Sequence, residues 1–374
     1  MIWLIKTGKI FLAAAYALIK CLPARNKVVM ISRQSNQPGV DFTLLGEELK
    51  RRSNVKVVYL CKTLEGKENA KIFTAIGYGF HMFRQMFHLA TSKVCVLNSY
   101  SIAVSLLHHK KSLTVIQMWH SNGTMKKFGY SALGTSEGSS PVIAKLLNMH
   151  RNYDVVLCSG AAYADHLCAG FDVKPNCIKI YTLPRFDLLC DNQYEKETRE
   201  KIYEKYPSLK GKKVVLYAPT FRGKEQLQNF FEHLKTLIDS FDYNYAQLVI
   251  KLHPLTGDFV SDGKAIVDNA FTTFDMLFVA DGVISDYSCM IYEAGTRDIP
   301  LYFYAYDLDL YRHARGLALD YSTLPGYTES DAKALVSDLK KPYDMEELKR
   351  FIGLYVENKS GCTERLVDLI ESYL

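Results

Sequence analysis

The chain has 374 residues, of which 48% are hydrophobic and 23% are charged. This length is too great for a typical single core and predicts two domains, and the composition is that of a folded globular protein. The formal net charge of +6 does not by itself indicate a nucleic-acid partner, whereas it suits anionic small substrates or an anionic membrane surface. The 9 cysteines are scattered without a metal-ligand spacing, which predicts reduced thiols in a cytosolic protein.

The first 22 residues are apolar but carry three lysines. Their uninterrupted apolar run, residues 10–19, is shorter than the roughly 20 residues that span a bilayer, and no small-x-small cleavage site follows it. We expect residues 1–22 to form an amphipathic membrane-associating helix, with Trp3, Phe11 and Tyr16 as interfacial anchors. The alternatives are a helix packed on the core and a cleaved signal segment.

After Pro23, apolar strands alternate with helices. The predicted strands of this first set lie at residues 28–32, 55–61, 94–98, 114–119, 155–159 and 178–183. The predicted helices lie at residues 44–52 and 70–91 and from residue 161 onward. The helix at 70–91 combines aromatic with basic residues, which fits a second membrane-facing surface as well as an ordinary amphipathic core helix.

A charged stretch at residues 191–213 ends the first set, and we place the domain junction there. The second set has predicted strands at residues 214–218, 248–252, 282–285 and 301–304 and predicted helices at 227–240 and 289–296. Continuously apolar strands that are separated by helices indicate parallel sheets. The sequence therefore predicts an α/β protein with two Rossmann-like domains, at residues 23–195 and 196–374.

Two histidines close hydrophobic strands, His120 after residues 114–119 and His253 after residues 248–252. Open α/β sheets place their chemistry at the carboxyl ends of strands, facing a crevice. The pair therefore suggests two parallel sheets that face each other across a central cleft.

His120 follows Trp119 and precedes a turn-forming segment that leads to Lys126 and Lys127. A histidine with a near-neutral pKa can take a proton from an acceptor hydroxyl, and the two lysines could hold phosphate. The alternative is a buried histidine satisfied by the backbone, with solvated lysines.

Two strand ends of the second set carry groups suited to phosphate. Lys251 and His253 point to the same face, because one residue separates them, and form a compact site for a pyrophosphate or a leaving phosphate. Thr220 and Arg222 follow the strand at 214–218, and a guanidinium matches phosphate geometry. The alternatives are capping of a strand end and a surface arginine after a turn.

The segment Ser285, Asp286, Tyr287 and Ser288 leads directly into a predicted helix. Backbone N–H groups at a helix start, with the added hydroxyls, form an anion site, so we expect a nucleotide diphosphate here. Glu293 lies one to two turns further on and could reach ribose hydroxyls, whereas Asp286 could equally be a plain N-cap.

Other chemical signals are weak. Asp307 and Asp309 form a DxD pattern like that of metal-dependent glycosyltransferases, but the pattern is too common to assign a metal site. The sequence has no Walker loop and no GxGxxG motif, which disfavours ATP and nicotinamide cofactors. The remaining histidines are assigned to structural or surface positions: His81, His88, His108, His109, His150, His166, His233 and His313.

The set of motifs resembles the CDP-glycerol glycerophosphotransferase family, the wall teichoic acid primases and polymerases with relatives in capsule synthesis. The motifs are, in order, Trp-His…Lys-Lys-x-Gly, Pro-Arg-x-Asp, Tyr-Ala-Pro-Thr-x-Arg, Lys-x-His-Pro, Ser-Asp-Tyr-Ser and Arg-Gly. Each is short, but six in this order over nearly the whole chain are specific.

The resemblance implies a GT-B-like fold with an N-terminal acceptor domain and a CDP-donor-binding C-terminal domain. It implies transfer of a polyol phosphate from a CDP-polyol to a hydroxyl of a lipid-linked saccharide or growing polymer, with release of CMP. Glycerol phosphate is the favoured group, and ribitol phosphate is the alternative. His120 then matches the general base and His253 a second histidine near the donor phosphates. The donor-contacting segments and the C-terminal signature match Arg222, Ser285, Asp286, Ser288, Arg315 and Gly316.

The partners implied are CDP-glycerol or CDP-ribitol, a lipid-linked saccharide and an anionic membrane surface on the cytoplasmic face of a bacterial cell membrane. No nucleic acid and no cofactor are implied, and homo-oligomerisation is left open. Family members commonly have Trp-His-Gly-Thr-Pro where this chain has Trp-His-Ser-Asn-Gly-Thr, which leaves the acceptor open. The long helical extension of the polymerases has no counterpart, which favours a primase-like or capsule-type enzyme. Two rival hypotheses are a GT-B glycosyltransferase with a nucleotide-sugar donor and an inactive membrane-associated scaffold.

Overall fold

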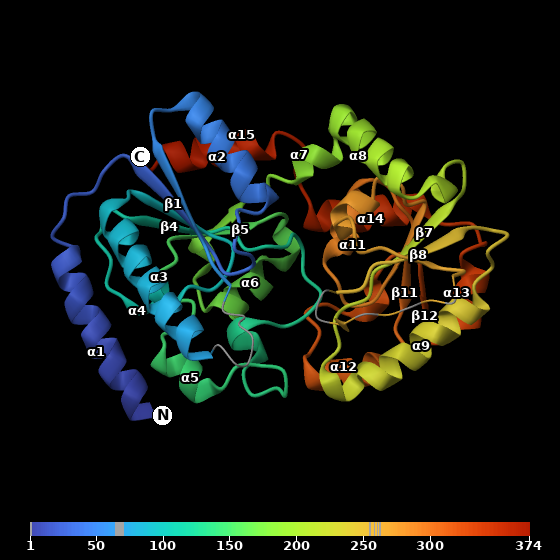
Figure 1. Cartoon of the computed structure of the whole chain (residues 1–374), viewed down its shortest axis with the longest axis horizontal. Coiled ribbons are helices and arrows are strands. Elements are labelled where there is room, and N and C mark those ends of the chain that lie inside the picture. Colours follow the sequence, from blue (N-terminus) through green and yellow to red (C-terminus); the bar gives the residue numbers. More distant parts are fainter. Residues whose placement is uncertain (1, 64–70, 254–255, 258, 260, 262) are drawn as a thin grey trace. The chain divides into compact units, whose positions relative to one another are not determined.

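The chain forms two α/β units, each built on its own sheet (Figure 1). The computed structural model describes residues 2–63, 71–253, 256–257, 259, 261 and 263–374. The first unit comprises Met1–Ser121, Lys127–Asp187 and Glu357–Leu374, and the second comprises Asn122–Lys126 and Leu188–Val356.

The first unit contains a six-stranded sheet in the order β2-β1-β3-β4-β5-β6. All neighbouring pairs in this sheet are parallel. The strands are β1 (Lys27–Ser32), β2 (Lys56–Cys61), β3 (Val94–Leu97), β4 (Thr114–Gln117), β5 (Val155–Cys158) and β6 (Ile178–Ile180). The helices are α1 (Ile2–Ile19), α2 (Val40–Arg52), α3 (Lys71–Thr91), α4 (Ile102–Leu106), α5 (Pro141–Leu146), α6 (Ala164–Phe171), α7 (Phe186–Leu189) and α15 (Cys362–Glu371).

The second unit contains another six-stranded sheet, in the order β12-β11-β10-β7-β8-β9, and its pairs are again parallel. The strands are β7 (Val214–Tyr217), β8 (Gln247–Ile250), β9 (Ile266–Val267), β10 (Gly282–Ser285), β11 (Leu301–Tyr304) and β12 (Tyr327–Glu329). The helices are α8 (Asn192–Lys205), α9 (Leu227–Ser240), α10 (Thr273–Met276), α11 (Met290–Thr296), α12 (Leu308–Ala314), α13 (Ala332–Asp338) and α14 (Met345–Tyr355). Short 3-10 helices lie in the first unit at Gly129–Ala132, Ala161–Tyr163 and Pro175–Cys177, and in the second unit at Pro207–Leu209, Lys224–Gln226 and Tyr321–Thr323.

The predicted α/β class with two parallel sheets is confirmed. Strands β3, β5, β7, β10 and β11 are buried along their whole length. Helices cover both faces of a parallel sheet, so strands within it have apolar side chains in consecutive positions.

The division between the units differs from the predicted junction at residues 195/196. The chain passes to the second unit at Asp187/Leu188, and the charged stretch at residues 191–213 includes the helix α8. Asp191 caps this helix by accepting hydrogen bonds from the N–H groups of Gln193 and Tyr194, at 2.8 and 3.0 Å. Few residues of α8 are buried, so its sequence carries little of the apolar periodicity that identifies a helix.

The C-terminal helix α15 packs in the first unit although residues 188–356 belong to the second. Its buried Leu366, Val367 and Ile370 join the core that includes Phe42 of α2. Asp187 accepts hydrogen bonds from the N–H groups at the start of α15, of Cys362 and Thr363, both at 2.8 Å. A carboxylate distant in sequence therefore caps this helix, which explains the Asp of the Pro-Arg-x-Asp motif.

The N-terminal helix α1 has one packed and one exposed face. Tyr16 is buried, and its hydroxyl lies 2.8 Å from Nδ1 of His109. Phe11 meets Phe83 of α3 edge to face, at 6.3 Å between ring centroids. Among the described residues no helix is long and apolar enough to cross a membrane.

Candidate active site

The second unit contains a pocket of about 880 Å³ at the carboxyl ends of its strands. Five residues that the sequence singled out line this pocket: Lys126, Thr220, Lys251, His253 and Ser288. They come from four separate segments, and three of these segments follow β7, β8 and β10. Parallel strands bring such segments to one edge of the sheet, as the strand-end argument requires.

Lys251 is oriented by a buried carboxylate. Its Nζ donates to Oδ2 of Asp268 at 2.9 Å and to the carbonyl oxygen of Asp268 at 3.1 Å. Asp268 is fully buried and also accepts a hydrogen bond from the hydroxyl of Tyr206 at 2.7 Å. The Lys251 ammonium is therefore held at the pocket wall in one position.

His253 lies at the same strand end as Lys251 and is exposed. Its ring lies 5.4 Å from the ring of Phe221, between centroids. Pro254, which completes the Lys-x-His-Pro motif, lies outside the described residues.

Lys126 reaches this pocket from a short segment that belongs to the second unit, although the residues on both sides of it belong to the first. Lys126 forms an antiparallel bridge with Leu317, and Ala318 donates its N–H to the carbonyl oxygen of Met125 at 3.0 Å. The sequence-based boundary at residue 195 assigned Lys126 to the first domain. A local sequence pattern could not show that Lys126 belongs to the second unit, because the segment is fixed by contacts with Leu317 and Ala318, some 190 residues later.

Gly123 is required in that segment. Its φ is +64°, and a Cβ there would lie 2.2 Å from the ring of Tyr292 on α11. The hydroxyl of Tyr292 donates to the carbonyl oxygen of Thr124 at 2.6 Å. The glycine that follows the Trp-His-Ser-Asn sequence thus lets the backbone lie directly against α11.

Burial lowers the pKa of Lys126, and the neighbouring Arg315 and Arg222 guanidiniums lower it further, whereas Cys289 and Asp286 oppose this shift. A bound anion would stabilise the charged ammonium and offset the cost of burying it. Lys126 is therefore a cation suited to an anionic ligand.

Two hydroxyl-bearing residues complete the polar wall. The N–H of Thr220 donates to Oδ1 of Asp286 at 2.8 Å, which fixes its backbone. Its Oγ1 is buried and has no hydrogen-bond partner among the described residues, so it is available to a ligand. Ser288 lines the pocket immediately before α11, which begins at Met290.

The other three residues of the Ser-Asp-Tyr-Ser motif are buried beneath the pocket rather than exposed to it. Ser285 donates its hydroxyl to the carbonyl oxygen of Ala218 at 3.1 Å. The hydroxyl of Tyr287 donates to Oδ1 of Asp307 at 2.9 Å. Only Ser288 of the four predicted donor-binding residues therefore lines the pocket.

Arg222 also occupies a different place from the one predicted. Its side chain is 1% exposed, and its Nε and Nη2 donate to Asp307 and Asp286 at 2.7 and 2.9 Å. Its Nη1 donates to the carbonyl oxygen of Thr220 at 2.7 Å. The two carboxylates raise the pKa of Arg222, against its burial. Each of its three nitrogens thus makes a hydrogen bond within the protein, and Arg222 ties neighbouring strand ends together.

Glu293, Arg315 and Gly316 do not line the pocket. Glu293 is half-buried in the first turn of α11. Arg315 and Gly316 follow α12, and Gly316 has a φ of +82°. Arg315 is close enough to Lys126 to affect its pKa, which leaves it beside the pocket.

In the first unit, His120 follows β4 and lies 3.1 Å from the carbonyl oxygen of Asn98, measured from its Nδ1. A carbonyl oxygen only accepts, so Nδ1 carries a proton, and in the neutral imidazole the lone pair is then on Nε2. Gln34 lies 3.4 Å from the same Nδ1, and its amide must then present oxygen to it. His120 is therefore in the tautomer that a general base acting through Nε2 requires.

Trp119 belongs to an aromatic cluster around His120. Its ring lies 4.2 Å from that of His120 and 5.0 Å from that of Phe128, between centroids. Trp119 has a φ of +62°, an unusual conformation for a bulky residue. Trp119 thus packs against the imidazole of His120.

Lys127, which the sequence also singled out, is exposed.

Arg185 of the Pro-Arg-x-Asp motif also supports His120. Its Nε donates to Oδ2 of Asp41 at 3.0 Å, and its Nη2 lies 3.4 Å from the carbonyl oxygen of His120. The sequence alone did not predict this supporting role of Arg185, because its partner Asp41 lies 144 residues earlier in the chain.

Several pocket residues had no clear signal in the sequence: Phe221, Asn269, Phe271, Thr272, Thr273 and Met290. Asn269 and its neighbours follow β9, which has two residues and is too short to be recognised from its apolar pattern. The sequence analysis also missed Asp268, because it did not recognise the short strand β9. The available signal was a polar residue directly after that strand.

The DxD pattern does not form a shared metal site. The Asp307 carboxylate is occupied by Arg222 and Tyr287, whereas the Asp309 side chain is 89% exposed. No cluster of three or more His, Cys, Asp or Glu side chains suited to a metal occurs in the part of the chain that is described.

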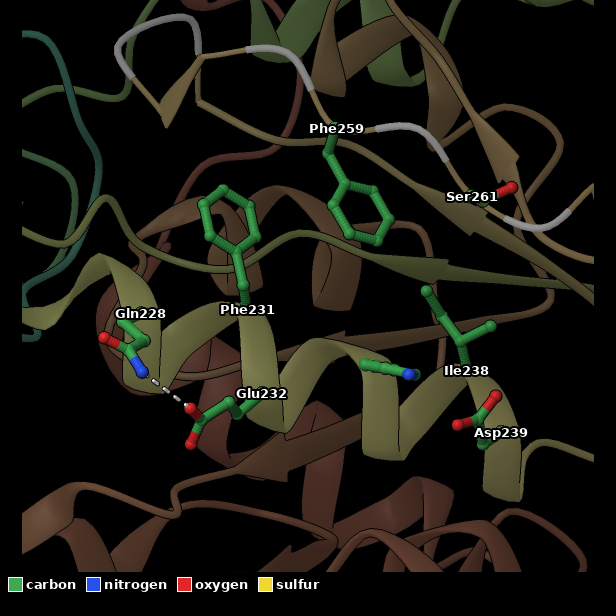
Figure 2. Close-up of a pocket in the computed structure, with 8 residues that line it drawn as sticks. Gln228, Phe231, Glu232, Ile238, Asp239, Phe259 and Ser261 are labelled. Atoms are coloured by element: carbon green, nitrogen blue, oxygen red, sulfur yellow. Dashed lines mark hydrogen bonds between the residues drawn. The ribbon is translucent and has the colours of Figure 1, made fainter.

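A second pocket, of about 780 Å³, runs along α9 (Figure 2). Phe231 and Phe259 stack in it at 5.7 Å between ring centroids. Glu232 and Asp239 also line it, Lys235 is the only cation among its described lining residues, and none of the predicted site residues lines it. Two carboxylates disfavour an anionic ligand, so the pocket at the strand ends is the better candidate for a nucleotide diphosphate.

A cationic pocket at the strand ends of one Rossmann-like unit and a histidine at a strand end of the other are the features expected of a GT-B-like transferase. Comparison with known proteins gives the family. Residues 14–372 match the family described as CDP-Glycerol:Poly(glycerophosphate) glycerophosphotransferase, and the chain belongs to it.

Individual relatives agree with this assignment. The chain is 30% identical over 380 residues to the teichoic acid ribitol-phosphate primase of Bacillus spizizenii, covering 96% of this chain and 95% of that one. It is 29% identical over 307 residues to the teichoic acid glycerol-phosphate primase of Bacillus subtilis, covering 79% and 77%. The structure of the wall teichoic acid polymerase TagF superposes with a TM-score of 0.74 at 19% identity, covering 99% of this chain and 94% of that one. The predicted family, GT-B-like fold and enzyme class are confirmed.

Replacing Arg222 tests its positioning role. Arg222→Met leaves two buried carboxylates without their cation, so we expect the free energy of unfolding to fall by about 3–5 kcal/mol in urea titrations. Arg312→Met, at an exposed arginine of α12 that pairs with the exposed Asp309, is the control and is expected to change it by less than about 1 kcal/mol. Unchanged stability in Arg222→Met, with weaker nucleotide binding, would instead indicate a direct ligand contact.

The lowered pKa of Lys126 predicts a pH dependence. A lysine with a lowered pKa loses its charge at a lower pH, so CDP affinity should decline as pH rises through that value, and Lys126→Arg should retain affinity to higher pH. Calorimetric titration of CDP across the alkaline range measures this, with Lys127→Arg as the exposed control. Superimposable alkaline profiles for wild type and Lys126→Arg would exclude Lys126 as the titrating cation.

Proposed function

We propose that this protein transfers a polyol phosphate from a CDP-polyol to a hydroxyl of a lipid-linked saccharide and releases CMP. The observation that carries this proposal is the pocket of the second unit. It brings together Lys126, Lys251 and His253, and no carboxylate is among its described lining residues. A pocket of this charge suits the diphosphate of a nucleotide-activated donor.

In the proposed reaction, the acceptor oxygen attacks the β-phosphorus of the CDP-polyol. A new bond forms between this oxygen and phosphorus, and the bond from phosphorus to the bridging oxygen breaks. The bridging oxygen leaves with CMP. A phosphate monoester has a second pKa near 6, so CMP leaves as an anion and requires positive charge around it more than a proton.

Lys126, Lys251 and His253 are proposed to stabilise this developing charge, and the unpartnered hydroxyl of Thr220 adds a hydrogen-bond donor. Arg222 and Asp286 hold the Thr220 backbone in place. Nothing in this scheme requires a step through a metal ion.

His120 is proposed as the general base that takes the acceptor proton through Nε2. Its hydrogen bond from Nδ1 to the Asn98 carbonyl selects the tautomer that can accept this proton. Arg185 and Trp119 hold the residue at its strand end. The relatives include ribitol-phosphate and glycerol-phosphate primases, so both CDP-ribitol and CDP-glycerol are candidate donors.

The test is acceptor-dependent release of CMP. The full chain is incubated with CDP-glycerol or CDP-ribitol and a lipid-linked disaccharide, and CMP is quantified by chromatography. We expect release with at least one donor, and a loss of about 10²–10⁴-fold in His120→Ala, the usual contribution of a general base. His313→Ala, an exposed histidine, is the matched control.

No CMP from either donor, with the acceptor present, would overturn the proposal and favour a nucleotide-sugar donor. Equal loss in His120→Ala and His313→Ala would remove His120 from the role of base.

We further propose that α1 and α3 attach the protein peripherally to the cytoplasmic face of the bacterial cell membrane. The two helices pack together (Figure 1) and expose large apolar residues: Trp3, Ile10, Phe11, Leu18, Phe80, Phe83 and Phe87. Exposed Lys6 lies on α1 beside this apolar surface. Exposed aromatic residues with flanking cations are typical of interfacial helices.

Charge on the exposed face of α1 should abolish this attachment. We expect the double variant Trp3→Glu, Ile10→Glu to lose co-sedimentation with vesicles that contain phosphatidylglycerol, because both residues are more than 70% exposed and their replacement does not disturb the core. Leu354→Glu, an exposed leucine of α14, is the control. Unchanged sedimentation of the double variant would exclude this face of α1 as the attachment surface.

A further inference from the structure

A small polar pocket lies in the first unit, at the carboxyl end of β2. It has a volume of about 300 Å³, and Lys62, His81 and Arg84 contribute its nitrogen groups. No carboxylate is among its described lining residues. His81 and Arg84 come from α3, and Lys62 directly follows β2.

His81 is the unusual member of this group. It is only 6% exposed, and its Nε2 has no hydrogen-bond partner among the described residues. Burial lowers the pKa of His81 to about 4, and the cations Lys62 and Arg84 add to this shift, so the imidazole is neutral and Nε2 can carry a proton. A buried polar atom without a protein partner is rare in folded proteins and indicates a partner from outside the chain, which is water or a ligand group.

The remaining contacts fit an anion. Lys62 is anchored by donation from Nζ to the carbonyl oxygen of Gly77 at 2.9 Å, which uses one of its three N–H groups. Arg84 is exposed, and its guanidinium can bind phosphate oxygens in a bidentate manner. Two cations and a buried neutral donor around 300 Å³ are therefore suited to a phosphate or diphosphate group.

The surroundings of the pocket indicate what the anion is attached to. Phe80 lines the pocket and is 73% exposed, and Phe83 and Phe87 continue the exposed aromatic surface along α3. This surface joins the exposed face of α1. An anion-binding pocket that opens beside an apolar surface matches an amphiphile with a charged group and a hydrocarbon chain.

The strand order shows how far this pocket lies from His120. Strands β1 and β3 lie between β2 and β4, so three spacings of about 4.8 Å, roughly 14 Å in all, separate Lys62's strand from the one before His120. Gln34, which follows β1, lies 3.4 Å from His120 on this edge. A short saccharide can bridge such a distance.

We propose that this pocket binds the diphosphate that links the acceptor saccharide to its lipid, with the lipid chain along α3 and the saccharide extending towards His120. The inference rests on the proposed function and specifies its acceptor. It gives His81, Lys62 and Arg84 a role in acceptor binding that the sequence did not indicate, since His81 was assigned there to a structural or surface position.

The experiment compares two soluble acceptors with the same disaccharide, one on a short alkyl diphosphate and one on a neutral alkyl glycoside. Arg84→Ala and Lys62→Gln are each expected to raise KM for the diphosphate acceptor about tenfold or more, because each removes a charge-assisted contact. KM for the neutral acceptor and for the CDP-polyol should stay within about twofold. Lys56→Ala, at the opposite end of β2, is the matched control.

The outcomes separate this inference from the proposed function. Release of CMP by wild type with no preference for the diphosphate acceptor, or equal effects of the variants on both acceptors, would overturn the inference and leave the function standing. Unchanged KM in Arg84→Ala with weaker binding to phosphatidylglycerol vesicles would reassign the pocket to membrane lipid. Failure of wild type to release CMP with either acceptor would overturn the proposed function itself.

Discussion

The second unit depends on one buried ionic cluster. Arg222 bridges the carboxylates of Asp286 and Asp307, which follow β10 and β11, while Arg222 itself follows β7. Three neighbouring strand ends are thereby tied together at 2.7–2.9 Å. Taking three charges out of water is costly unless each is paired, so this arrangement tolerates little displacement of any strand end. The pocket wall, including Thr220 and Ser288, is built on this fixed base.

A second constraint brings the cation Lys126 to that pocket, on a short segment of the second unit that is far in sequence from the rest of that unit. Gly123 lets the segment before Lys126 lie against Tyr292, and pairing with Leu317 completes its attachment. The departure from the usual Trp-His-Gly-Thr-Pro sequence therefore still provides a glycine close behind the histidine. The conformational freedom of that glycine, rather than its distance from the histidine, is what the attachment requires.

Local sequence patterns predicted the sheets well and the contacts behind them poorly. The apolar runs that end in His120 and His253 identified strands and the sheet edge at which the candidate site residues lie, because parallel strands bury consecutive residues. The same patterns showed that Arg222 follows a strand, but they did not show that Asp286 and Asp307 pair with it. The two-residue β9 and the C-terminal α15 were not recognised, because the first is too short for periodicity and the second is placed by contacts with Asp187 and α2.

The two strand-end histidines have different environments, which fit the different roles proposed for them. A general base must be neutral and must present a lone pair, and the Asn98 carbonyl, by accepting a hydrogen bond from Nδ1–H, leaves Nε2 as the nitrogen that carries the lone pair in the neutral His120. His253 lies instead beside Lys251 in a pocket whose described lining has no carboxylate, where the proposed reaction needs a donor to phosphate oxygen. An anion bound there favours the protonated imidazole, so the same ligand that needs the charge also stabilises it. Proton acceptance and charge stabilisation can thus be divided between two histidines that a sequence pattern cannot tell apart.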